Sequence, residues 1–275
     1  MSRDPGLQSM DSELRDALAV AIAAARRVGA VLRDGLEDVD KTCETKAHRY
    51  DPVTRYDRDA EQILVDALGS AFPECGIVTE EGTNRAGASA SRWILDPLDG
   101  TNNLLRGVPH FATSIGLVDG DGPALACIYD PCRDELFAAM RGSGAYLNGR
   151  RIRVSAGATL EGAVVSVGLP TLPERRETVI GQLPVFAPHV RSLRVTGSAA
   201  LDLAYVAAGR FDATWYLSLQ DWDVAAGRLL VTEAGGTVTD LEGRRMLDPA
   251  DGVLASNGPL HPAMLAAVHA SPAAR

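Results

Sequence analysis

The feature that most constrains this chain is a pair of acidic residues placed directly after a short apolar run. Asp96 and Asp99 enclose Pro97 and Leu98, immediately after the apolar residues 93–95. Proline has no N–H and a fixed φ, so we expect the strand to end here, with both acids on a tight turn. Two carboxylates three residues apart on a rigid turn repel one another unless a cation lies between them. The sequence therefore predicts a fold that gathers acids around a cation.

Two further acids occupy comparable places. Glu80 follows the short strand expected over 77–79, and Asp223 opens a helix expected over 222–234. Carboxylate oxygens are the ligands of Mg²⁺ or Mn²⁺ and not those that select zinc. Taken singly, each acid is more typical of a turn or a helix cap than of a metal ligand. It is their combination that predicts a metal site.

Backbone N–H groups are expected beside the acids. Gly100 and Thr101 follow the acidic turn and are expected to begin a helix, whose first N–H groups form an anion site. Metal ions held by carboxylates activate a water and neutralise phosphate oxygens, while N–H groups hold the phosphate. This arrangement predicts phosphoryl chemistry.

Helical and strand-like segments are mixed along the chain. Apolar residues recur at helical spacing over 11–37, where Asp11 and Ser12 are expected to cap the helix, and a polar loop is expected over 38–50. Gly turns separate strand-like runs over 111–154, which predicts an antiparallel meander. Further helices are expected from Asp57 to the region of Gly69 and over 198–208, 222–234 and 261–269, with strands over 77–79, 93–95, 164–167, 213–217, 237–239 and 253–255. The mixture predicts an α+β fold of helices packed on sheets, with a seam near residue 156.

Composition excludes several classes of protein. The 275 residues, 46% hydrophobic and 23% charged, are ordinary for one large or two small globular domains. The net charge of −9 argues against binding to a nucleic-acid backbone. The four cysteines include no Cys-x-x-Cys pair, which argues against a zinc knuckle or a disulfide framework. No signal-like segment opens the chain, and its longest apolar run, 17–25, is too short to cross a bilayer. We expect a cytoplasmic protein with no membrane partner, in which residues 1–9 are a loose leader.

Two motifs resemble those of a known family. The segments 93–101 (WILDPLDGT) and 222–236 (WDVAAGRLLVTEAGG) resemble signatures of the inositol monophosphatase family, within the lithium-sensitive, metal-dependent sugar phosphatase superfamily. The resemblance covers residues 46–260. Its other matching elements, in family order, are Lys46 with Asp51–Thr54 and Asp57, then Glu80-Glu81, the extension of the first motif to Asn103, Gly197–Ala200, and Ala255–Gly258.

The resemblance implies two or three Mg²⁺ ions, with Mn²⁺ as an alternative. A first ion would be held by Glu80, Asp96 and the carbonyl oxygen of Leu98. A second would be held by Asp96, Asp99 and Asp223, and a third by Glu80 and water. Lithium is expected to inhibit by entering one of these positions.

The resemblance also assigns catalytic and phosphate-binding roles. Thr101 would pair with Asp57 to orient and deprotonate the attacking water, with Glu80 completing the catalytic set. A threonine hydroxyl is no base by itself, but one that donates to a carboxylate can accept from water. Gly100 and Thr101 would bind the phosphate through their N–H groups.

The substrate residues implied by the resemblance are Asp99, Gly197, Ser198, Ala199 and, at a departure from the family pattern, Tyr216. Seven residues before the acid of the second motif, animal inositol enzymes have an acidic residue that grips inositol hydroxyls. Tyr216 stands there and offers one oxygen and a flat apolar face. It could bond a ring hydroxyl or stack on a sugar or base. We therefore expect slow or broad activity on myo-inositol 1-phosphate.

The sequence thus predicts a Mg²⁺-dependent phosphomonoesterase for a small polyol phosphate: an inositol, cyclitol or sugar phosphate. The alternatives are a phosphatase of the same superfamily for histidinol phosphate, fructose 1,6-bisphosphate or 3′-phosphoadenosine 5′-phosphate, and a non-catalytic regulatory interaction protein on the same fold.

The implied fold is a layered α/β/α/β/α sandwich of the inositol monophosphatase and fructose-1,6-bisphosphatase type, dimeric in many relatives, so a homodimer is expected. We expect residues 1–155 to form an α+β half with most of the metal ligands. Residues 156–275 would form an α/β half with the substrate helix and the last ligand, in one continuous catalytic unit.

Overall fold

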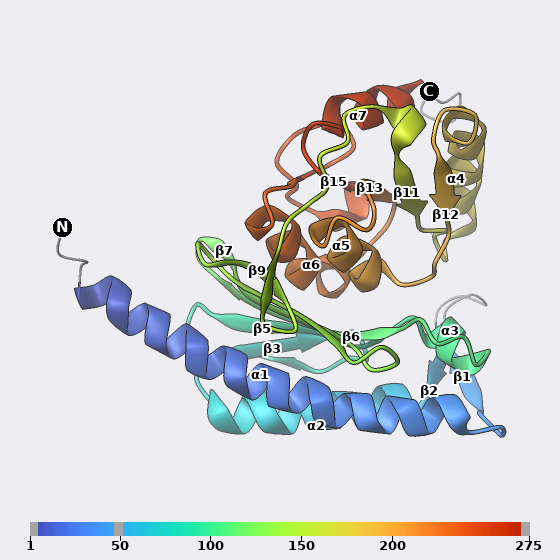
Figure 1. Cartoon of the computed structure of the whole chain (residues 1–275). Coiled ribbons are helices and arrows are strands. Elements are labelled where there is room, and N and C mark those ends of the chain that lie inside the picture. The colour runs from blue at the N-terminus through green and yellow to red at the C-terminus, as the bar shows by residue number, and fades with distance from the viewer. Residues whose placement is uncertain (1–4, 47–51, 271–275) are drawn as a thin grey trace.

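The protein is built of alternating layers of helices and sheets (Figure 1). The computed structural model describes residues 5–46 and 52–270, with side chains from residue 12 onward. Helices α1 and α2 cover one face of a large sheet, α5 and α6 lie between this sheet and a smaller one, and α4 and α7 cover the outer face of the smaller sheet. The α+β fold class predicted from the sequence is confirmed.

The outer helices are longer than the sequence indicated. Helix α1 spans Pro5–Glu37, so the predicted cap at Asp11 and Ser12 is wrong, and residues 5–9 of the predicted leader are helical. Proline is well suited to the first position of a helix because its missing N–H would have no partner there. Helix α2 spans Arg55–Ala71 and is capped by Thr54, two residues earlier than expected.

The large sheet carries the predicted meander. Among the described residues it has eight strands in the order β10-β9-β8-β7-β6-β5-β3-β4. Neighbouring strands from β5 to β10 are antiparallel, whereas β3 and β5 are parallel. The bounds are β3 Gly76–Thr79, β4 Asn84–Arg85, β5 Arg92–Asp99, β6 Ala112–Asp119, β7 Gly122–Asp130, β8 Glu135–Met140, β9 Gly144–Leu147 and β10 Arg150–Ile152.

The acidic turn is part of a strand. Strand β5 does not end at Pro97 but continues to Asp99, so the predicted turn is wrong. Asp96 pairs with Ser114 and Asp99 with Ala112, so one extra residue is accommodated on β5 as a bulge. A bulge leaves a residue without its ladder partner, and proline is tolerated at such a place. The turn was expected to hold Asp96 and Asp99 rigidly in place. The bulge does this instead, because it redirects both acids within a rigid sheet.

The smaller sheet follows in sequence. Its order is β12-β11-β13-β15-β14 among the described residues. Its strands are β11 Val164–Val167, β12 Ser192–Arg194, β13 Ala213–Tyr216, β14 Thr237–Thr239 and β15 Val253–Ser256, and its helices are α4 Pro173–Phe186, α5 Ala199–Ala207, α6 Asp221–Glu233 and α7 His261–His269. The sequence did not indicate α4, whose apolar residues follow no single face and which contains Pro184.

Smaller elements complete the chain. Strand β1 (Cys43–Thr45) lies within the segment expected to be a loop and pairs with β2 (Pro52–Thr54), which follows that segment. Residues 47–50 of that loop lie outside the described residues. The short helix α3 spans Thr101–Leu105, and 3-10 turns span Leu160–Gly162 and Pro249–Asp251.

Three apolar layers hold the sandwich together. The first lies between α1, α2 and the large sheet, the second around α5 and α6, and the third between the smaller sheet and α4 and α7. Trp93 and Trp215 are fully buried in the first and third. No helix in the described part of the chain is long and apolar enough to cross a membrane. The four cysteines are free thiols. The division of the chain at residue 155 stays a prediction.

Candidate metal-dependent active site

The β5 bulge places Asp96 at the centre of the candidate site. The Asp96 side chain is 1% exposed and accepts a hydrogen bond from the Leu98 N–H over 3.0 Å. The Pro97 carbonyl accepts from the Thr113 hydroxyl of β6 over 3.1 Å. The bulge is thus held from within and from the neighbouring strand, which fixes the direction of the Asp96 carboxylate.

A glycine joins the bulge to α3. Gly100 has φ of +101°, a left-handed conformation that an L side chain adopts at a cost. A Cβ there would also stand 3.1 Å from the His110 carbonyl oxygen and the Phe111 Cβ. Thr101 directly follows and begins α3, as the sequence predicted.

Thr101 and Asp57 are brought together from distant parts of the chain. The Thr101 Oγ1 donates to Asp57 Oδ1 over 2.8 Å and lies 3.2 Å from the Leu98 carbonyl oxygen. Both side chains are buried. The contact joins the first turn of α2 to the end of β5, and it is the pairing that the resemblance implied.

The other oxygen of Asp57 belongs to the start of α2. Asp57 Oδ2 accepts from the Thr54 N–H over 2.7 Å and from the Thr54 hydroxyl over 2.6 Å. Burial raises the pKa of Asp57, and the hydrogen bonds from Thr54 and Thr101 oppose that rise. The sequence indicated Thr54 only as part of a matching motif and without a role, although Thr-x-x-Asp before a helix is a readable capping-box pattern.

The acids form one electrostatic group. Burial raises the pKa of Asp96 well above its usual range, and the negative charges of Glu80, Asp99 and Asp223 add to the rise. Burial raises the pKa of Asp223 in the same way, again with contributions from Glu80 and Asp99. Burial raises the pKa of Asp99 to about 6. Such carboxylates need a cation or protons to stay together.

Lys46 supplies one positive charge at the edge of this group. Its Nζ lies 2.9 Å from Glu80 Oε1 and 2.6 Å from Glu81 Oε1. Burial works against the Lys46 charge, but the two carboxylates together raise its pKa. Burial also raises the pKa of Glu81, to about 7. One ammonium faces four candidate ligand carboxylates, so negative charge remains in excess.

Asp99 is held by the start of the predicted substrate helix. Its carboxylate accepts from the Ser198 hydroxyl, from the Ala199 N–H over 3.2 Å and from the Ala200 N–H over 2.8 Å. The helix α5 thus binds an acid of the other sheet with its first N–H groups. Gly197, also expected at the substrate, lies beside Asn103.

The donor set fits a hard divalent cation. As they stand, no three His, Cys, Asp or Glu side chains of residues 5–46 and 52–270 are gathered closely enough to hold an ion. Glu80 is turned to Lys46 and Asp99 to α5. The kinds of donor atom nevertheless fit Mg²⁺, because the predicted ligands are carboxylates and one carbonyl, and burial raises the pKa values of Asp96 and Asp223.

Asp223 reaches the group from α6. It lies in the first turn, where its Oδ2 accepts from the Gln220 N–H over 2.7 Å. This contact and the Gln220 side chain form a capping box that fixes the first turn of the helix. The sequence indicated Asp223 through the motif at 222–236. The capping box explains why an acid is placed in the first turn of α6.

Tyr216 lies against an acid that the sequence did not single out. Its hydroxyl donates to Asp202 Oδ2 over 2.6 Å, and Asp202 Oδ1 accepts from the Thr196 hydroxyl over 2.7 Å. Asp202 is on α5, fully buried, and burial raises its pKa to about 7. The signal available in the sequence was an acid inside an otherwise apolar helix, where every neighbour is also buried.

The raised pKa of Asp202 predicts a pH-dependent effect on stability. Below about pH 4 the carboxyl is protonated in both the folded and unfolded states and carries no penalty. Between about pH 4 and pH 7 the unfolded protein ionises this carboxyl while burial keeps it protonated in the folded protein, so the free energy of unfolding falls as the pH rises and levels off above about pH 7. Asp202→Asn, which stays neutral, should therefore gain stability relative to the unmodified protein between these pH values, by up to about 4 kcal/mol. Urea unfolding of both proteins from pH 5 to pH 8 measures the difference, and a difference independent of pH would contradict the assignment.

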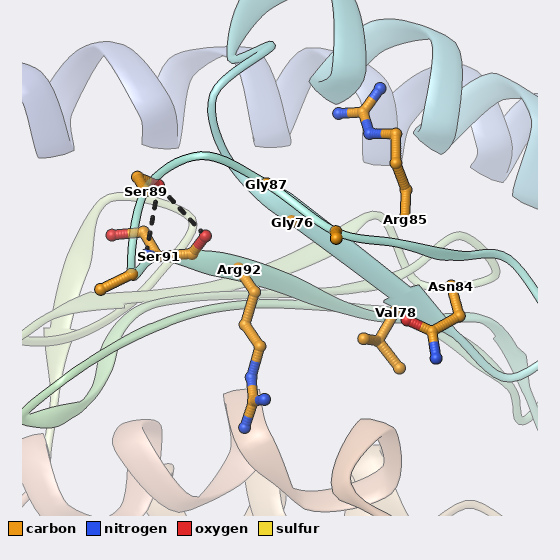
Figure 2. Close-up of a pocket in the computed structure, with 10 residues that line it drawn as sticks. Gly76, Val78, Asn84, Arg85, Gly87, Ser89, Ser91 and Arg92 are labelled. Atoms are coloured by element: carbon orange, nitrogen blue, oxygen red, sulfur yellow. Dashed lines mark hydrogen bonds between the residues drawn. The ribbon is translucent and has the colours of Figure 1, made fainter.

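A cavity of about 260 Å³ lies elsewhere, at the β3–β4 edge of the large sheet. Figure 2 shows that Arg85 and Arg92 point away from one another there, while Ser89 and Ser91 are joined by hydrogen bonds. Its lining contains none of the acids of the candidate site. The polar groups do not converge, so this cavity is not the candidate active site.

Comparison with known proteins agrees with this geometry. The chain matches the model of the inositol monophosphatase family over residues 13–273. It is 41% identical over 257 residues to Nus factor SuhB of Pseudomonas aeruginosa, across 91% of this chain and 95% of that protein. The crystal structure of extragenic suppressor protein suhB from Bartonella henselae matches with a TM-score of 0.89 and 42% identity, across 93% and 99% of the two chains.

A less similar solved structure contains Mg²⁺ and phosphate. It is an IMPase/NADP phosphatase complexed with Mg²⁺ and phosphate, with a TM-score of 0.78 and 28% identity over 97% of each chain. These likenesses confirm the layered fold that the motifs implied. The chain therefore belongs to the inositol monophosphatase family.

Proposed function

We propose that the protein is a Mg²⁺-dependent phosphomonoesterase that hydrolyses a small polyol phosphate, such as an inositol, cyclitol or sugar phosphate. The observation that carries this proposal is the Thr101–Asp57 hydrogen bond of 2.8 Å beside four acids that influence one another. A hydroxyl tied to a buried carboxylate next to a cation-binding group is an arrangement for activating water. Membership of the family supports the same activity.

The residues that would hold Mg²⁺ are Glu80, Asp96, the Leu98 carbonyl, Asp99 and Asp223. Bound there, the ions would lower the pKa of a water and neutralise charge on the phosphate oxygens. That a similar structure contains Mg²⁺ and phosphate supports this choice of ion.

Thr101 and Asp57 would handle the proton of the attacking water. The Thr101 hydroxyl gives its single proton to Asp57, so the free lone pair of Thr101 Oγ1 can accept a hydrogen bond from water and orient it. The raised pKa of Asp57 brings this carboxylate closer to the range in which a base accepts a proton efficiently. Gly100 and Thr101 would hold the phosphate through their N–H groups, and Glu80 would complete the catalytic set.

The substrate would lie between the acids and the start of α5. The Ser198 hydroxyl and the Ala199 N–H are already engaged with Asp99, so any contact they make with the substrate would be shared with that carboxylate. Tyr216 would form part of the wall on this side. The same site geometry would serve histidinol phosphate, fructose 1,6-bisphosphate or 3′-phosphoadenosine 5′-phosphate, so a panel of substrates has to decide.

Phosphate release should occur with Mg²⁺ and stop on chelation. We expect the purified protein to release inorganic phosphate from at least one member of a panel of polyol, sugar, histidinol and nucleotide monophosphates at millimolar Mg²⁺. Excess EDTA should remove the activity and added Mg²⁺ should restore it, because the ligand set binds hard divalent cations. Release that survives exhaustive chelation would contradict the metal-dependent mechanism. No release from any member would contradict the proposed activity itself.

A second candidate is a regulatory interaction protein on the same fold. Relatives about as long as this chain carry the name Nus factor SuhB, which favours it. This chain retains all four candidate metal acids, which a purely regulatory role would not require. Binding of Mg²⁺ without turnover of any substrate in the panel would favour the regulatory role.

A further inference from the structure

The buried carboxyl of Asp202 and the ring of Tyr216 form a contact that the proposed chemistry does not use. The Tyr216 side chain is 6% exposed and gives its hydroxyl proton to Asp202 over 2.6 Å. Thr196 donates to the other Asp202 oxygen. A tyrosine whose proton is committed in this way can only accept a hydrogen bond from anything else.

The ring of Tyr216 also lies directly on the backbone of Gly168. A Cβ built on Gly168 would stand 1.9 Å from Tyr216 Cε1 and 2.0 Å from Cδ1. Gly168 does not have the left-handed φ that would by itself call for glycine. The glycine is therefore required by the neighbouring ring and not by its own backbone.

The ring stands beside the acidic group. Burial raises the pKa of Tyr216 well above its usual range, and the charges of Asp202, Asp99 and Asp223 add to the rise. Asp99 is in turn held by the first residues of α5, the helix that carries Asp202 one turn further on. Tyr216 thus lies on the side of the acids that faces the smaller sheet.

We propose that Asp202 and Gly168 are positioning residues that hold the Tyr216 ring as a fixed wall of the substrate site. This rests on the proposed phosphatase function as far as the substrate is concerned. Asp202 holds the hydroxyl end of the ring, and Gly168 leaves room for the edge formed by Cδ1 and Cε1. The wall offers a substrate one oxygen lone pair and the edge of a ring, so it suits a phosphorylated polyol that presents one hydroxyl and C–H surface here. The wall does not suit a polyol phosphate that is bound through a pair of its hydroxyls.

This pairing changes what a substitution at Tyr216 should do. Tyr216→Glu alone would place a second carboxylate against Asp202, and two carboxylates in contact do not both ionise. Activity toward myo-inositol 1-phosphate is therefore expected to rise for Tyr216→Glu only when it is combined with Asp202→Asn.

Steady-state kinetics separate positioning from direct contact. The substrate is the panel member that the unmodified protein hydrolyses fastest. Tyr216→Phe and Asp202→Ala should each raise KM by about 3- to 10-fold, the net worth of one hydrogen bond, with kcat changed less than about twofold. The double variant should be no worse than either single one, because both remove the same contact. Asp202→Asn, whose amide oxygen still accepts from Tyr216, should keep KM near the unmodified value.

Tyr146→Phe is the matched control, since its hydroxyl bonds the Ser143 carbonyl on a distant turn. A rise in KM for Tyr216→Phe but not for Asp202→Ala would overturn positioning by Asp202, because the hydroxyl would then meet the substrate without the help of that carboxyl. Equal KM values for all variants would overturn the proposal as a whole.

Thermal unfolding tests the same contact without any substrate. Gly168→Ala should lower Tm by about 5 °C, because the new methyl group displaces the ring. In the Tyr216→Ala background the same change should leave Tm unaltered. If Gly168→Ala costs the same in both backgrounds, the ring does not depend on this glycine. Absence of phosphatase activity would leave this measurement intact, so failure of the proposed function is distinguishable from failure of the wall.

Discussion

Asp96→Asn should abolish phosphate release and weaken Mg²⁺ binding together. Asp96 is the most central acid of the group, because the charges of Glu80, Asp99 and Asp223 all raise its pKa, and it is proposed to hold two ions. Losing several kcal/mol of charge stabilisation in the transition state lowers turnover by about 10³-fold or more. The amide of asparagine fits the same space, so the bulge of β5 should survive.

Turnover and calorimetric titration with Mg²⁺ measure the two effects of Asp96→Asn. Asp121→Asn, on the exposed turn between β6 and β7, is the matched control for the loss of one negative charge. Circular dichroism should show an unchanged fold. If Asp96→Asn bound Mg²⁺ like the unmodified protein and still lost turnover, the acid would have another role. If it turned over normally, the assignment of this carboxylate to the metal site would be wrong.

Asp57→Asn should separate turnover from metal binding. Asp57 is proposed to act through Thr101 and to contact no ion, so Mg²⁺ affinity should stay within about threefold of the original, while turnover falls by roughly 10²–10⁴, the size of a general-base contribution. The single amide oxygen of asparagine can take the place of Oδ2 and still accept from Thr54, so the start of α2 should stay folded, while the amide NH2 then faces Thr101 and cannot accept its proton.

Thr101 provides the comparison for this experiment. Thr101→Ser keeps the hydroxyl and should keep most of the turnover, whereas Thr101→Val removes it and should resemble Asp57→Asn. Because the two residues act as a unit, the double variant Asp57→Asn, Thr101→Val should be little slower than either single one. Normal turnover of Asp57→Asn would contradict the assignment of this pair to the attacking water.

The sequence predicted the local elements of the site better than their surroundings. Strand, acids, glycine and helix from residue 93 to residue 105 are consecutive, so their patterns are readable along the chain. The error at Pro97 has a physical cause. Proline can end a strand or sit in a bulge, and the choice depends on the neighbouring strand β6, which lies later in the chain.

Other misses have similar causes. Helix α4 carries no clear apolar face and contains Pro184, so periodicity could not indicate it, and its position depends on packing against α7. The cap of α1 was placed at Asp11 because acidic and hydroxyl residues mark helix starts, but a proline further upstream opens the helix. Asp202 was overlooked because an acid within a helix usually faces solvent.

The sequence by itself determined the family, the alternation of helices and sheets, and the kind of donor atoms available, because these follow from motifs and from residue types. Only the tertiary structure decided which donors meet. Asp57 and Thr101 are 44 residues apart, and Ser198 and Asp99 are 99 apart. The sequence left the Tyr216 hydroxyl available to a substrate. In the structure this hydroxyl donates its hydrogen bond to Asp202. Each of these contacts depends on how α2, α5 and the two sheets pack, and packing is a property of the whole chain that no local pattern contains.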